Sequence, residues 1–114
     1  MNISKDTAED LLKRALGRMP ELGKIGNITS GELDLGNESR LDYTQILSGN
    51  GDVSTHARFK SHQYLVTVGL DVSGAGQAKP SVEIRVASSA GGYMDPRNEA
   101  EERVAYDTFW RAIQ

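Results

Sequence analysis

The sequence predicts an α+β fold: a two-layer sandwich in which N- and C-terminal helices pack on one face of an antiparallel meander of four or five strands (α-β-β-β-β-β-α). Apolar residues recur at helical spacing near both ends of the chain and alternate with polar residues in the middle. The segments between the alternating stretches are too short for parallel crossovers. A chain of 114 residues fits one α+β domain, residues 1–114.

The first helix is expected over residues 6–19. Its apolar positions follow spacings of three and four, which places them on one face of a helix; they are Ala8, Leu11, Leu12, Ala15, Leu16 and Met19. Ser4 or Asp6 can cap its first backbone N–H groups. Pro20 ends it, because the proline ring disfavours helical geometry in the preceding residue.

Alternation predicts strands near residues 33–35, 41–47, 53–60, 64–72 and 82–86. The apolar residues change parity near Gln45, which allows a bulge there. Glycine and asparagine at 36–37 and 49–52 are typical of turns, because both residues tolerate positive φ. A short turn is expected at 61–62 and a flexible loop at 74–80.

The second helix is expected to begin with Asp95 as its cap and Pro96 at its first position. Tyr106 and Trp110 lie beside its apolar stripe, which consists of Val104, Ala105, Thr108, Phe109, Ala112 and Ile113. Before this helix, residues 88–96 predict a plain connection with Tyr93 or Met94 docked on the domain.

Composition excludes several chemistries. The chain has no cysteine, which rules out thiol catalysis, disulfides and zinc–thiolate sites. A net charge of -3 lacks the basic footprint of a general nucleic-acid binder, so nucleic acid is not the expected partner. No apolar run reaches membrane-spanning length, and the N-terminus lacks a secretory apolar stretch. We therefore expect a cytoplasmic protein if Met1 is the native start, and a periplasmic or lipid-anchored one if a signal segment was removed.

Two histidines are the first candidates for chemistry. His56 and His62 flank a predicted hairpin and could approach each other, but no third residue has the spacing of a metal ligand. We expect exposed histidines, no metal and no cofactor. No serine sits in a nucleophile elbow, so the sequence predicts no enzyme.

Two surfaces are candidates for binding. The most basic stretch places His56, Arg58 and Lys60 on the polar side of one strand, with Phe59 on the core side. Tyr106 and Trp110 form an aromatic ridge on the second helix, and both residue types are enriched at interface hot spots. The sequence therefore predicts a non-enzymatic binding or adaptor domain that acts through a protein–protein surface.

Two alternatives stay open, together with one mode of self-association. The first alternative is a small-molecule-binding domain or enzyme, with a pocket between sheet and helices and Tyr43 or Tyr64 facing in. The second is a small acidic phage-type inhibitor that mimics nucleic acid. A homodimer could form through an edge strand. The layout resembles small α+β modules such as cystatin-like sheets, secretion chaperones and small bacterial lipoproteins, in architecture alone.

Overall fold

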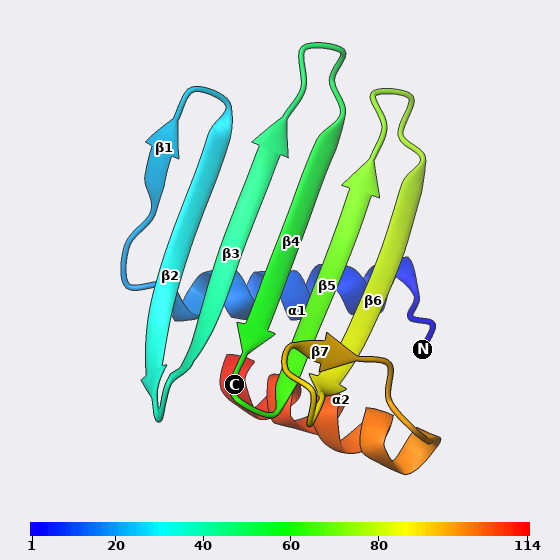
Figure 1. Ribbon diagram of the computed structural model, residues 1–114. Coiled ribbons are helices and arrows are strands. Elements are labelled where there is room, and N and C mark those ends of the chain that lie inside the picture. Colours follow the sequence, from blue (N-terminus) through cyan, green and yellow to red (C-terminus); the bar gives the residue numbers. More distant parts are fainter.

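The computed structural model describes residues 1–114 as one seven-stranded sheet and two helices (Figure 1). The elements in chain order are α1 (Lys5–Arg18), β1 (Gly23–Ile25), β2 (Ile28–Gly36), β3 (Ser39–Leu47), β4 (Val53–Lys60), β5 (Tyr64–Val72), β6 (Ala78–Ala87), β7 (Tyr93–Met94) and α2 (Glu99–Ile113). The strands lie in the order β1-β2-β3-β4-β5-β6-β7, and every neighbouring pair is antiparallel. The predicted α+β meander is confirmed, with seven strands rather than four or five.

The two additional strands are the edges of the sheet. β1 has three residues and β7 has two, which is too short for alternation to be recognised in a sequence. The loop expected at 74–80 is also shorter than predicted. Ser73 and Gln77 close a tight turn by a backbone hydrogen bond of 2.8 Å, and β6 begins at Ala78.

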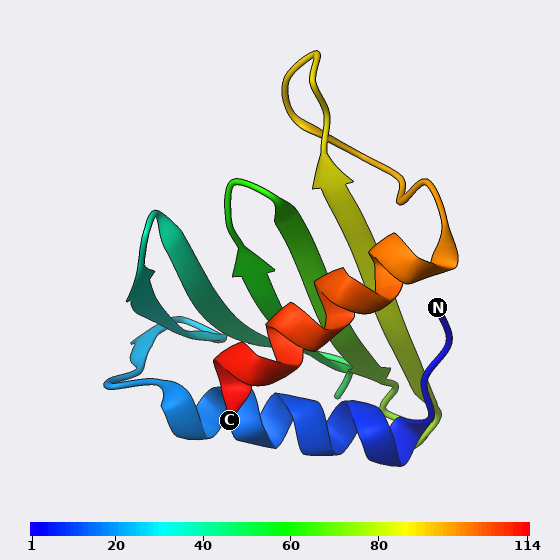
Figure 2. The ribbon, with the colours of Figure 1, turned by 90° about the horizontal axis from the view of Figure 1, so that it is seen from below.

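Both helices lie on the same side of the sheet, where they cover its apolar face (Figures 1 and 2). Val66, Val68 and Leu70 of β5 are buried, as are Leu11 of α1 and Phe109 of α2. Removing this apolar area from water is the main stabilising contribution to the fold. Neither helix is long and apolar enough to span a membrane.

The caps confirm one helix start and correct the other. Ser4 caps α1 by accepting a hydrogen bond from the Thr7 backbone N–H at 3.1 Å. The expected cap at Asp95 is wrong, because Asn98 accepts from the Glu101 backbone N–H at 2.9 Å and α2 begins at Glu99. Asp95 instead forms an ion pair with Arg85 of β6. Pro96 misled the prediction, because proline is common at the first position of a helix but is also found in the segment that precedes one.

The packed side of α2 is rotated from the predicted stripe. Val104 is exposed, whereas Ala105, Phe109 and Ile113 are buried. Tyr106 and Trp110, expected beside the stripe, pack partly against the core. The cause is that α2 contacts both α1 and the sheet, so its packed side is wider than one stripe.

The bulge expected near Gln45 is also displaced. β3 keeps strict alternation to its end, so Gln45 points to the helix side and Ile46 points to the opposite side. The irregularity lies between Asp34 and Gly36 of β2, where positive φ angles at Gly36 (80°), Asn37 (52°) and Glu38 (58°) form the turn into β3. The change of parity in the sequence instead reflects Ile46, which lies on the face opposite the helices in a strand of unbroken register.

Candidate functional site

No helix covers the second face of the sheet, which we call the open face. Residues paired across neighbouring strands project to the same face, so the strand register arranges the open face in rows. Three rows cross its β1–β3 half. We name them the apolar row (Ile25, Ile28, Ile46), the small-residue row (Gly23, Ser30, Thr44) and the acidic row (Glu21, Glu32, Asp42).

Three of the five predicted site residues lie on this face. His56, Arg58 and Lys60 alternate along β4 with buried Thr55, Ala57 and Phe59, which point to the helices. His56 extends the small-residue row, and Arg58 extends the acidic row. Neither Arg58 nor Lys60 has a carboxylate within 4 Å, so both cations face solvent unpaired.

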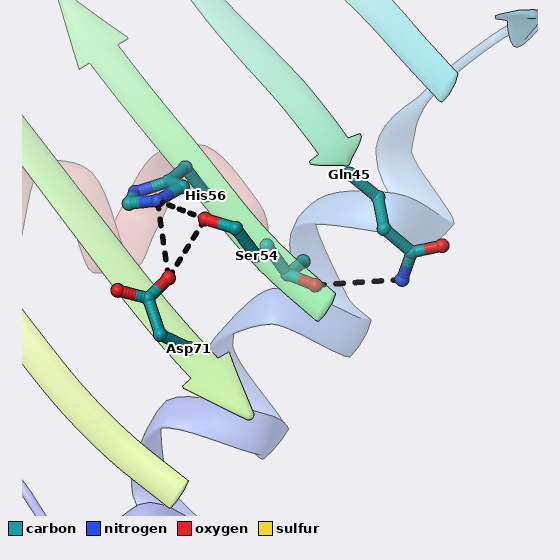
Figure 3. Close-up of polar contacts among 5 residues, drawn as sticks. Gln45, Ser54, His56 and Asp71 are labelled. Atoms are coloured by element: carbon teal, nitrogen blue, oxygen red, sulfur yellow. Dashed lines mark hydrogen bonds and ion pairs between the residues drawn. The ribbon is translucent and has the colours of Figure 1, made fainter. Parts of the chain in front are cut away.

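His56 belongs to a cluster that sequence reasoning did not find (Figure 3). The Oγ of Ser54, two residues earlier on β4, lies 2.9 Å from His56 Nε2 and donates to Asp71 Oδ1 of β5 at 2.7 Å. The Asp71 oxygen lies 3.6 Å from the same nitrogen. Asp71 is brought there by strand pairing, which places Asp71 opposite Ser54.

The cluster does not form the charge relay of a serine hydrolase. A relay needs the serine on one ring nitrogen and the carboxylate on the other, so that histidine can accept the serine proton. Here both groups approach Nε2, and the single hydroxyl proton of Ser54 goes to Asp71. The arrangement fixes the imidazole ring on the sheet but does not activate Ser54 as a nucleophile.

A hollow of about 580 Å³ lies between the acidic row and His56. Its floor carries Ser30 and Thr44, and its rim carries Glu32, Asp42 and Arg58. Glu21 also lines this hollow, at the edge of the sheet, and its backbone passes Gly31 on the helix side of β2. A Cβ at Gly31 would lie 3.0 Å from the Glu21 carbonyl oxygen, so only glycine permits this approach without a shift.

A second hollow, of about 590 Å³, lies at the end of the open face toward the β4–β5 turn. Lys60, Arg40 and Tyr93 line it, and the Tyr93 hydroxyl donates to the Ser61 carbonyl oxygen at 2.6 Å. His62 lies at this end and contacts Glu38. The two histidines therefore engage different partners in different parts of the sheet.

The other two predicted site residues line a groove between α1 and α2. Tyr106 and Trp110 are half-buried there, in a hollow of about 540 Å³ whose other walls include Asp6 and Asp10. The Arg14 guanidinium lies 4.9 Å from the centre of the Trp110 ring, so α1 already covers an aromatic face. Burial raises the pKa of Tyr106; Arg103 opposes this rise, and Asp107 adds to it.

The structure places Tyr43 and Tyr64, the residues of the small-molecule alternative, at different sites. Tyr43 is buried in the sheet–helix layer, and this burial raises its pKa. Tyr64 lines a hollow of about 450 Å³ at the end of the seam between α2 and the sheet, with Phe59 and Thr108. The two tyrosines do not line a common hollow among those described above.

Comparisons with protein-family models, with characterised proteins and with solved structures give no match to this chain. Besides Ser54 and Asp71, sequence reasoning missed the apolar row and Glu32. One feature of the sequence could have revealed the apolar row. Counting by twos along each strand, Ile28 shares a face with Glu32 and Ile46 shares a face with Asp42, and apolar side chains are seldom found on the charged face of a strand.

Proposed function

We propose that the protein is a non-enzymatic binding domain that engages a protein partner through the open face of its sheet. The observation that carries this proposal is the unpaired charge on an otherwise complete β-sheet face. Arg58 and Lys60 have no carboxylate partner, and Glu32 and Asp34 have no basic partner. Such groups are available for complementary charges on a partner.

The open face is a better candidate than the aromatic ridge. Tyr106 and Trp110 already contact Arg103 and Arg14 of this chain, so a partner would have to displace these arginines. The open face needs no such displacement, because no helix lies over it and only the β6–β7 segment rises beside its end, next to the second hollow (Figures 1 and 2).

The chemistry of the open face argues against two other partner classes. β2–β6 carry no phenylalanine, tyrosine or tryptophan side chain on this face, the His56 ring is held by Ser54 and Asp71, and Tyr93 at the rim is half-buried, so the face lacks a row of aromatic side chains on which successive bases could stack. A mimic of nucleic acid would need a uniformly negative surface. The open face instead mixes acids with Arg40, Arg58 and Lys60.

Capture from an extract with matched baits tests the proposal. One bait carries Arg58→Glu and Lys60→Glu on the open face. The control carries Lys13→Glu and Arg111→Glu on the exposed sides of the helices, which changes the net charge equally. A specific partner should be retained by the wild type and the control and lost by the open-face variant, and calorimetry with the purified partner should repeat this order.

The opposite result would contradict the proposal. If a partner stays bound to the open-face variant but is lost when Trp110 is changed to Phe, binding takes place at the helix groove. Ligand-induced shifts of Tyr64 and Thr108 amides in a small-molecule screen would instead favour the alternative of a ligand-binding domain.

A further inference from the structure

The polarity of the sheet is inverted at one corner. At the end of the sheet near the β1–β2 turn, Lys24, Thr29 and Gln45 lie side by side on the helix side, next to exposed Leu47. The open face there carries the apolar row, in which Ile25 is 85% exposed and Ile28 is 40% exposed. Exposed Ile25 and Ile28 and half-buried Ile46 are aligned across three strands and form an apolar patch, which is characteristic of an interaction site.

The apolar row borders a trough whose floor is the small-residue row, and the hollow in this floor is lined by the small-residue and acidic rows but not by the isoleucines. Alternate residues along a strand are about 7 Å apart, so the apolar and acidic rows are separated by about 14 Å, with the small-residue row between them. An α-helix with its side chains is about 10–12 Å in diameter. Gly23 has no side chain, and those of Ser30 and Thr44 are short, so the space between the apolar and acidic rows stays open. The hollow of about 580 Å³ lies along the small-residue row.

The opposite wall is negative. Over β2 and β3 this face carries Glu32, Asp34 and Asp42 with one base, Arg40, and Glu21 lines the hollow at the sheet edge, which gives a net charge of −3 (four acids minus one base). Arg58 of β4 continues the acidic row and lines the same hollow, and including it gives a net charge of −2. Arg40 pairs with Asp42 at 3.1 Å, while Glu21 and Glu32 have no cation within 4 Å. A ligand lying in the trough would therefore meet isoleucine on one side and carboxylate on the other.

We propose that this trough binds an amphipathic helix of a protein partner, with its apolar side against the isoleucines and lysine or arginine residues against Glu21 and Glu32. The inference rests on the proposed function and specifies the partner's chemistry. A second copy of this chain does not supply such a helix, because the apolar sides of α1 and α2 are buried against its own sheet. Helix-in-groove recognition combines apolar anchors at helical spacing with flanking charges in this way.

The test uses three synthetic 18-residue peptides and ¹⁵N-labelled full-length protein. The first is a helix of leucine, alanine and lysine with one apolar side and lysines along its border. The second has glutamate in place of every lysine, and the third is a scramble of the first. We expect the first peptide alone to shift the amides of the three rows defined above, Ile25, Ile28, Ile46, Gly23, Ser30, Thr44, Glu21, Glu32 and Asp42.

Substitutions in the apolar row and in the acidic row then test the contribution of each row to peptide binding. Ile25→Ser, at a position too exposed to affect folding, should weaken binding of the basic amphipathic peptide by about tenfold. Glu32→Gln should weaken it and reduce its salt dependence. The matched controls Val104→Ser and Glu99→Gln, which change an exposed valine and an exposed glutamate of α2, should leave the dissociation constant unchanged.

Several outcomes would overturn the inference. Equal shifts from the glutamate peptide would show that the acidic row is irrelevant, and equal shifts from the scramble would show that the apolar side of the helix is irrelevant. No shift at about 1 mM of the first peptide would show that the trough does not bind a basic amphipathic helix. Binding of zwitterionic lipid vesicles that Ile25→Ser abolishes would make the apolar row a lipid contact. A negative peptide test combined with partner loss on Arg58→Glu and Lys60→Glu would reject the helix and keep the open face as the binding surface.

Discussion

The imidazole of His56 lies directly over Gly69, its paired residue on the neighbouring strand. A Cβ placed on Gly69 would come within 2.8 Å of two ring atoms of His56 and within 2.9 Å of Ser81 Oγ. The absence of a side chain at 69 is therefore what allows the ring to lie against the sheet, where Ser54 and Asp71 hold it.

Gly69→Ala should accordingly displace the His56 ring and lower the free energy of unfolding by about 1 kcal/mol, as expected for modest overpacking. Urea denaturation measures the loss, and histidine NMR signals report the ring. The control is Gly23→Ala, a strand position with no atom within 4 Å of the added Cβ. The control should be neutral or slightly stabilising, and equal losses at both positions would show that His56 is not the cause.

The contact between Arg14 and Trp110 should stabilise the two-helix layer. Trp110→Ala should lower the free energy of unfolding by about 2 kcal/mol, less than for a fully buried tryptophan, because the side chain is half-buried. A double-mutant cycle with Arg14→Ala should give a coupling of about 0.5 kcal/mol, typical of an exposed cation–π pair.

The double-mutant cycle cancels the separate contribution of the Arg14–Asp10 ion pair, so the coupling energy reports the Arg14–Trp110 contact alone. A coupling energy of zero would therefore contradict the stacked geometry. Trp110→Phe provides a control, since it keeps an aromatic ring below the guanidinium and should retain part of the coupling.

Alkaline pH should destabilise the protein through two tyrosines. Burial raises the pKa of Tyr43 and of Tyr106 above the usual value of about 10. Above that pH the unfolded chain releases these protons while the folded chain retains them, so the free energy of unfolding falls as pH rises through the folded pKa values. Below pH 10 these two groups contribute no pH dependence.

Urea denaturation between pH 8 and 11.5 measures this decline, and ultraviolet difference absorbance follows tyrosinate formation. The Tyr43→Phe and Tyr106→Phe double variant should show a weaker decline than the wild type. A decline of the same size in both proteins would show that other groups cause it.

The start of α2 can be tested by removing each candidate cap. Asn98→Ala should lower the free energy of unfolding by about 1 kcal/mol, because it leaves the Glu101 backbone N–H without its acceptor. Asp95→Ala should change it by only a few tenths of a kcal/mol, since the Asp95 side chain is 82% exposed in its ion pair with Arg85. A larger loss at Asp95 would move the functional cap back to that residue.

The sequence by itself determined the α+β class and the face on which each β4 and β5 side chain lies, and it narrowed the cap of α1 to Ser4 or Asp6, of which the structure shows Ser4. These features depend on short-range periodicity. Successive side chains of a strand point to opposite faces, and a helix repeats every 3.6 residues, so the local sequence shows which residues share a face. The same reasoning placed His56, Arg58 and Lys60 on one face of a strand. It would also have placed Ile46 on the open face if strict alternation, rather than a bulge near Gln45, had been assumed for β3.

The tertiary structure alone decided which residues become neighbours across strands. Register brings Asp71 to His56 and aligns Ile25, Ile28 and Ile46 in one row, although these residues are distant in the chain. It also decided that Tyr106 and Trp110 lie against α1. Register and helix docking depend on turn geometry and on the packing of the whole core, so no local pattern contains them.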